Sequence, residues 1–251
     1  VNIYNITRYN KEMTKNITTL ILKQLYPILE NFVEKKVIDL ARAEYFGIMK
    51  NQQLHSQTEK FKRDDLENNA WRKSAIGSGN GLGNPIAQAL QTTYFRETNS
   101  NVVNLTVAAN AAIFMRNSMD GKSERFGFNP VVDRFWNATR VHHYPQGGGF
   151  MSAHKDEYFP QALGLKEDLS FLQCAVLLSS KGIDFYQGGA FVVLETGEKI
   201  MLDDQGDAGT LVIFDGRLIH GVADVDPDQV LDWKNEKGRM AIFSNLYKYY
   251  D

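Results

Sequence analysis

Residues 140–160 read RVHHYPQGGGFMSAHKDEYFP, a strand-like pattern that ends with His154 and Asp156 two positions apart. Side chains two positions apart in an extended strand point to the same side, so these two share a face. A second histidine, His220, lies downstream in LVIFDGRLIHGVADVD. Two histidines and one carboxylate on separate strands can bind a divalent metal on one face and leave the other open, which suits non-haem Fe(II). The sequence therefore predicts a metal centre at His154, Asp156 and His220.

Two further strands carry polar side chains on one face. In the strand before His154, one face is predicted to carry Arg140, His142 and Tyr144 and the other Val141 and His143. The last apolar stretch, RMAIFSNLYKYY, begins at Arg239. A barrel lined by these faces would bring a tyrosine and an arginine close to the predicted metal ligands. A structural role is the favoured interpretation for both His142 and His143, and lining the pocket is the alternative for His142, which shares a face with Tyr144.

Composition limits the classes of protein that fit. The chain has 251 residues, of which 43% are hydrophobic and 12% aromatic, enough for the core of one large domain. A formal net charge of −2 gives no overall basic footprint for a nucleic acid. The single cysteine, Cys174, forms no intramolecular disulfide. With no apolar run of membrane length and no signal-peptide pattern, we expect a cytoplasmic protein without a membrane partner; the oligomeric state is left open.

The predicted fold class follows from a change in the hydrophobic pattern along the chain, from helical spacing to short apolar runs separated by turn residues. We predict a single domain over residues 1–251, in which 1–130 supply mainly helical support and lid elements. Residues 131–251 are predicted to form a mainly β, double-stranded β-helix (a jelly-roll, cupin-like barrel) that carries the metal site. The predicted helices span 11–50 (interrupted near Pro27), 85–97 and 102–115, and the predicted strands after residue 160 span 171–178, 189–194, 199–202, 210–215, 219–225 and 239–247.

Three loops receive specific interpretations. The glycine-rich segment 77–83 and the segment 226–238 are candidate lids over the site. The acidic run at Asp203, Asp204 and Asp207 is interpreted as a solvated turn, because it lacks the spacing of a calcium-binding loop.

The ordered set of motifs resembles the Fe(II)/2-oxoglutarate-dependent dioxygenases, in outline their prolyl-hydroxylase-like and phytanoyl-hydroxylase-like branches. The resemblance covers roughly residues 135–250 and rests on His154-x-Asp156, on His220 within IFDGRLIHGV and on Arg239 in the final strand. Tyr144-Pro-x-Gly-Gly before the first ligand and Gly188-Gly189-Ala190-Phe191 between the ligands support it.

The resemblance implies a role for each of these residues. His154, Asp156 and His220 would bind Fe(II), which 2-oxoglutarate chelates and dioxygen then reaches. Arg239 would bind the far carboxylate of 2-oxoglutarate, since a guanidinium offers two parallel donors and stays charged when buried. The Arg-x-Ser pair common among relatives reads Arg239-Met-Ala here, so Tyr144 or Thr210 would have to supply the assisting hydroxyl.

The sequence restricts the type of reaction more than it restricts the identity of the substrate. With Asp156 present, halogenation is disfavoured, whereas hydroxylation, desaturation and oxidative cyclisation stay open. We expect a small amino-acid-like or carboxylate-bearing substrate, with His142 and Arg140 as candidate contacts. The cationic candidates that the sequence leaves unranked are Arg72, Arg96, Arg116, Arg125, Arg134 and Arg140. The alternatives are a prolyl-type hydroxylase of protein side chains, a non-catalytic cupin-like binding barrel, and a jelly-roll enzyme that uses another metal without 2-oxoglutarate.

Replacing His154 or His220 with alanine is expected to abolish turnover and leave the fold largely intact. Succinate release and far-ultraviolet circular dichroism measure the two properties. Retained activity in either variant would rule out the predicted metal triad.

Overall fold

The computed structural model describes residues 26–78, 86–156 and 172–249. Within these ranges two long helices, α2 (Lys35–Asn51) and α3 (Val103–Met119), and one short helix, α4 (Pro130–Asp133), accompany a large β-sheet. Single 3-10 turns lie at Arg63–Leu66 and Leu202–Asp204. None of the helices in the described part of the chain is long and apolar enough to cross a membrane.

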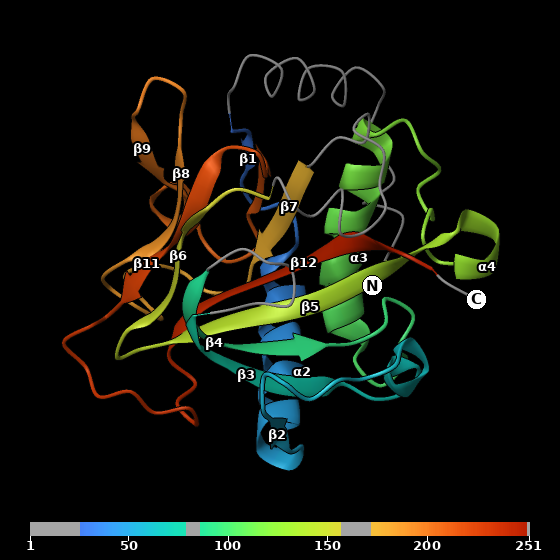
Figure 1. The fold of residues 1–251 in the computed structure, drawn as a ribbon, viewed down its shortest axis with the longest axis horizontal. Coiled ribbons are helices and arrows are strands. Elements are labelled where there is room, and N and C mark those ends of the chain that lie inside the picture. Colours follow the sequence, from blue (N-terminus) through green and yellow to red (C-terminus); the bar gives the residue numbers. More distant parts are fainter. Residues whose placement is uncertain (1–25, 79–85, 157–171, 250–251) are drawn as a thin grey trace.

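The sheet curls into two facing halves (Figure 1). In order, one half contains β1 (Ile28–Leu29), β10 (Leu211–Asp215), β7 (Leu172–Leu177), β12 (Gly238–Lys248), β5 (Phe135–Pro145) and β4 (Ala87–Tyr94), extended by β3 (Trp71–Ser78) and β2 (Leu54–His55). The other half contains β6 (Gly149–His154), β11 (Ile219–Val225), β8 (Gly189–Val193) and β9 (Lys199–Met201). Strand β4 pairs with both β5 and β6 and so connects the halves. This is the predicted double-stranded β-helix.

The helices cover the outer face of the first half. In Figure 1, α2 and α3 lie against the sheet formed by β5, β12 and β7, and α3 contacts all three of these strands. The apolar core between them includes Leu105 and Ala109 of α3 and Met240 and Ile242 of β12. Since side chains alternate along a strand, the intervening β12 residues point to the interior of the barrel.

The predicted C-terminal strands are confirmed. Strand β11 has the predicted bounds, 219–225, and β7, β8, β9, β10 and β12 lie within about one residue of theirs. The helix predicted over 102–115 is α3.

The helix predicted over 85–97 is wrong, because residues 87–94 form strand β4. Ala, Leu and Gln are good helix formers, but propensity is a weak prior that tertiary context overrides. Here the backbone groups of β4 pair with β3, β5 and β6. The N-terminal segment therefore supplies part of the barrel wall as well as helical support.

Other N-terminal predictions are met in part. Pro27 precedes the short strand β1, and α2 begins at Lys35, so the second part of the predicted 11–50 helix is present from that residue. Residues 11–25 of the predicted helix and 79–83 of the candidate glycine lid lie outside the described residues, whereas Gly77 and Ser78 end β3.

Helix α3 offers a direct test of the packing. Leu105 is fully buried, so Leu105→Ala is expected to lower the free energy of unfolding by about 2–5 kcal/mol through lost burial and the cavity left behind. Val103 is 53% exposed in the same helix, and Val103→Ala should change it by no more than about 0.5 kcal/mol. Urea denaturation measures both; equal losses would contradict the placement of α3.

Candidate metal centre and ligand cavity

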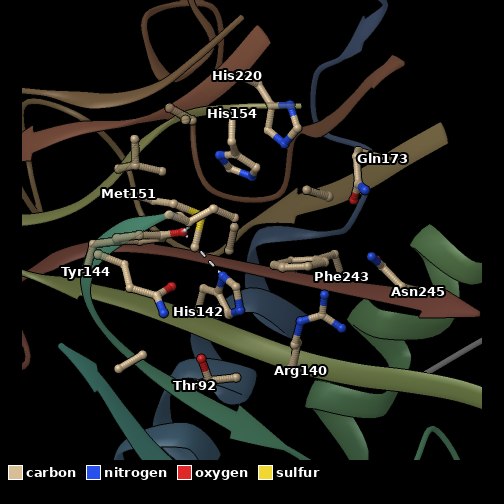
Figure 2. A pocket seen from close by; sticks show the side chains of 18 of the residues that line it. Thr92, Arg140, His142, Tyr144, Met151, His154, Gln173, His220, Phe243 and Asn245 are labelled. Atoms are coloured by element: carbon tan, nitrogen blue, oxygen red, sulfur yellow. Dashed lines mark hydrogen bonds between the residues drawn. The ribbon is translucent and has the colours of Figure 1, made fainter. Parts of the chain in front are cut away.

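Strand pairing places the two predicted histidine ligands opposite each other. In the antiparallel pair β6–β11, His220 is the direct register partner of His154. Their ring centroids are 4.3 Å apart, and Figure 2 shows both imidazoles on the same side of the cavity. Asp156 follows β6, and its backbone N–H donates to the carbonyl of Gly216 at 2.9 Å, which fixes it beside the turn before β11.

Backbone carbonyls set the tautomer of both rings. The Nδ1 atom of His154 lies 2.8 Å from the Ser152 carbonyl, and that of His220 lies 2.9 Å from the Leu218 carbonyl. A carbonyl only accepts, so each Nδ1 carries the proton and each Nε2 presents a lone pair. Both Nε2 atoms lie 3.8 Å from the Asp156 carboxylate, one from each of its oxygens.

This donor set fits a divalent metal. One ligand atom from each of His154, Asp156 and His220 lies within 4.8 Å of the others. Burial lowers the pKa of His220, which favours the neutral ring that a metal requires. A metal-binding histidine is usually oriented by a hydrogen bond from its other ring nitrogen, here Nδ1, to an acceptor such as a backbone carbonyl. The structure therefore brings the three predicted ligand side chains close enough together to bind one metal ion.

Gln173 was missed by the sequence analysis. Its Nε2 donates to the second oxygen of Asp156 at 2.6 Å from strand β7, in the other half of the barrel. Gln173 and Ala175 alternate along β7 and both line the cavity, but the partner of Gln173 across the barrel is a tertiary contact that the sequence does not show. The bond orients the carboxylate toward the histidines.

A cavity of about 850 Å³ extends from the three candidate ligands between the two halves of the barrel. Its volume lies in the upper part of the range for small-ligand sites, so it has room for more than one small molecule. The β12 residues that line it are alternate ones, Arg239, Ala241, Phe243, Asn245 and Tyr247, as strand periodicity predicts.

Arg239 lines the cavity and is buried, and the carboxylate of Asp203 compensates its charge. Its Nε donates to Asp203 at 2.9 Å. The same carboxylate oxygen accepts the backbone N–H of Ala190. Asp203 is only 4% exposed, so its interpretation as part of a solvated turn is wrong. A carboxylate is stable at this depth because it has a cationic partner and a backbone donor.

Gly189 is the residue of the GGAF motif at which β8 begins. Its φ is +107°, and a Cβ at this position would lie 2.7 Å from the Asp203 carboxylate. A side chain would therefore strain the backbone and displace the partner of Arg239.

The remaining predicted site residues divide into two groups. Tyr144, His142 and Arg140 line the cavity from β5. Thr210 does not line it among the described residues: its hydroxyl packs against Gly206 at the turn before β10, so its predicted contact with a cofactor is not supported. His143 points to the helix side, where it is fully buried against Tyr45, as its structural interpretation implies.

His142 and Tyr144 interact directly. The Nδ1 atom of His142 lies 3.2 Å from the Tyr144 hydroxyl (Figure 2). Burial, reinforced by the nearby charges of Arg140, Arg239 and Lys73, lowers the pKa of His142 well below its ordinary value. Burial raises the pKa of Tyr144 to about 12. At neutral pH the ring is therefore neutral and the phenol keeps its proton.

Only Arg140 among the six unranked arginines lines the described cavity. Arg72, for example, donates to the carbonyls of Met49 and Gln52 and to Gln91, and Arg116 donates to Ser244 and Asn137. The candidate lid at 226–238 supplies no residue to the described lining of the cavity. Its Trp233 carbonyl accepts a hydrogen bond from Gln91 instead.

No family model matches the sequence, and no curated protein matches it. Solved structures do match. A prolyl hydroxylase from Trichoplax adhaerens, in complex with a hypoxia inducible factor peptide fragment, superposes with a TM-score of 0.59 at 10% identity, over 95% of this chain and 90% of that one. A Pseudomonas putida prolyl-4-hydroxylase has a TM-score of 0.54 at 14% identity, over 95% and 100%.

A third similar structure is the non-haem α-ketoglutarate-dependent epimerase SnoN from nogalamycin biosynthesis. Its TM-score is 0.57 at 9% identity, over 94% of this chain and 83% of SnoN. The chain shares the fold of these enzymes. The similarity extends over the N-terminal segment as well as the barrel.

Gln173→Leu tests the support of Asp156. Loss of the bond is expected to weaken Fe(II) binding by roughly 10- to 100-fold, the usual cost of removing a partner of a metal ligand. Anaerobic titration calorimetry measures the affinity. Asn245→Leu replaces another amide side chain of the cavity with leucine and should leave the Fe(II) affinity unchanged. Equal effects of the two variants would contradict the role of Gln173.

Proposed function

We propose that the protein is an Fe(II)- and 2-oxoglutarate-dependent oxygenase that oxidises an unactivated C–H bond of a small molecule. The observation that carries this proposal is the arrangement of His154, Asp156 and His220, in which both unprotonated Nε2 atoms lie 3.8 Å from one carboxylate. Two histidines and one carboxylate leave coordination positions open, which suits Fe(II) enzymes that bind cosubstrate and dioxygen. The SnoN structure, which shares the fold, contains Fe3+ and α-ketoglutarate.

The bound groups would supply the chemistry: dioxygen and 2-oxoglutarate are consumed, succinate and CO2 are released, and in the hydroxylation case the substrate C–H becomes C–OH. The protein's own contribution is to bind, orient and exclude water. Desaturation and oxidative cyclisation require the same site and remain alternative outcomes.

Arg239 is the proposed partner of the far carboxylate of 2-oxoglutarate. Its Nε is taken by Asp203, and its two terminal nitrogens have no hydrogen-bond partner among the described residues. Since Asp203 holds the guanidinium from behind, the terminal nitrogens can face the cavity as a fixed pair of donors. Asp203 is therefore a positioning residue in this proposal.

Tyr144 is proposed to assist the cosubstrate. Its ring centroid lies 5.5 Å from the Arg239 guanidinium carbon. It keeps its proton at neutral pH, and the neutral His142 beside it can accept that hydrogen bond or release it to an incoming carboxylate. This hydroxyl stands in for the serine that is absent after Arg239.

A protein substrate is the second candidate, because two of the matched structures are prolyl hydroxylases. The first candidate is favoured by the interior of the cavity, where charged and aromatic side chains line a space of about 850 Å³. Such a lining can bind all parts of a small molecule. A catalytically inactive binding barrel would also fit the fold. It would not explain why His154 and His220 both present an unprotonated Nε2 beside Asp156.

Arg239→Ala tests the cosubstrate assignment. The affinity for 2-oxoglutarate is expected to fall by about tenfold or more, because ionic hydrogen bonds are lost, whereas Fe(II) affinity should stay near wild type. Anaerobic calorimetry with Fe(II) and then 2-oxoglutarate measures both constants.

The control addresses the charge left on Asp203. The double variant Arg239→Ala, Asp203→Asn removes both charges and should show the same loss of 2-oxoglutarate affinity. Unchanged 2-oxoglutarate affinity in both variants would mean that another residue binds its far carboxylate.

A further inference from the structure

Arg140 has a buried charge with no anionic partner among the described residues. The residue is 6% exposed, and its Nη1 donates to the Ala138 carbonyl at 2.9 Å. Its guanidinium carbon lies 4.4 Å from the ring centroid of Phe243 and 5.9 Å from that of Tyr94. No carboxylate pairs with it within the described ranges, and its Nε and Nη2 make no hydrogen bond to described residues.

Lys73 places a second cation in the same region. It lines the cavity from β3, and its Nζ lies 5.6 Å from the Tyr94 ring centroid. Burial lowers the pKa of Lys73, and the charge of Arg140 lowers it further. Both cations lie near the same ring, since the Arg140 guanidinium carbon is 5.9 Å from the Tyr94 centroid. Lys73, too, has no ion-pair partner in the described part of the chain.

The described charges that line the cavity give these two cations no carboxylate partner. The described lining residues contain two carboxylates, Asp156 and Glu59. Asp156 faces the candidate metal site, and Glu59 is bound by His55 and the Ser56 backbone. Arg239 has Asp203. Lys60 also lines the cavity, but it is exposed, so solvent and salt screen its charge. Among the described residues, an anion that enters the cavity therefore meets its strongest unsatisfied attraction at the less exposed Arg140 and Lys73.

We propose that Arg140 and Lys73 form a subsite for the carboxylate of the substrate, separate from the cosubstrate site at Arg239. The subsite deepens the proposed function and rests on it. The free Nε–Nη2 edge of Arg140 matches the two oxygens of a carboxylate, and stacking on Phe243 holds that edge in place. Lys73 adds a mobile point charge.

The residues around the subsite indicate what the rest of the substrate is like. Tyr94, Phe243 and Tyr247 surround the two cations, so the group attached to the carboxylate packs against aromatic rings. In Figure 2, His154 and His220 lie in the upper part of the view, and His142 and Arg140 both lie below them. A substrate anchored by its carboxylate would thus extend toward the metal ligands and present a carbon remote from its charge.

The test measures binding, so it needs no knowledge of the reaction. The probes are aliphatic and aromatic monocarboxylates, each compared with its own primary amide, added anaerobically to protein saturated with Fe(II) and 2-oxoglutarate. At least one carboxylate is expected to bind, and to do so about tenfold or more tightly than its amide, because ionic hydrogen bonds are the difference. Arg140→Gln should remove this preference, Lys73→Gln should reduce it, and Arg140→Lys should retain part of it.

Lys35→Gln, which removes an exposed cation outside the cavity, is the control and should behave as wild type. The inference is overturned if no carboxylate is preferred over its amide, or if the preference survives Arg140→Gln. It is also overturned if Arg140→Gln weakens 2-oxoglutarate itself, since the subsite would then belong to the cosubstrate. Failure of the wild-type protein to bind 2-oxoglutarate would instead refute the proposed function.

Discussion

The antiparallel register of β6 and β11 is the constraint on which the candidate site depends. It sets His154 opposite His220, and the chain that continues from β6 brings Asp156 beside both. A shift of one residue in either strand would turn its histidine to the other face. Carbonyl acceptors on both Nδ1 atoms and the Gln173 amide on Asp156 then fix the direction of each ligand atom.

A second requirement is that charge inside the barrel be balanced. The buried Arg239 is tolerated because Asp203 pairs with it, Ala190 donates to the same carboxylate, and Gly189 leaves space for it. Arg140 and Lys73 have no such partner in the described ranges. Proteins rarely bury a charge without one, so the imbalance points to a bound anion as the missing partner.

Most of the barrel could be predicted from the sequence, because its signals are local. Strand alternation with glycine and aspartate turns located β7 to β12, and the spacing of His154, Asp156 and His220 selected three side chains that the fold brings together. Strand β4 was mistaken for a helix because its residues favour helices and only its neighbours make it a strand. Gln173, Asp203 and Lys73 were missed for a similar reason: their partners come from other strands, and no local pattern encodes such contacts.

The measurement that tests the central claim most directly is visible absorption during an anaerobic titration of the apoprotein with Fe(II) and then 2-oxoglutarate. The account predicts a weak metal-to-ligand charge-transfer band that requires both components, since bidentate chelation needs a ferrous centre with two open positions. If Fe(II) binds and no band appears, the protein is a different kind of metal enzyme. If Fe(II) does not bind at all, the triad is not a metal site and the account is wrong.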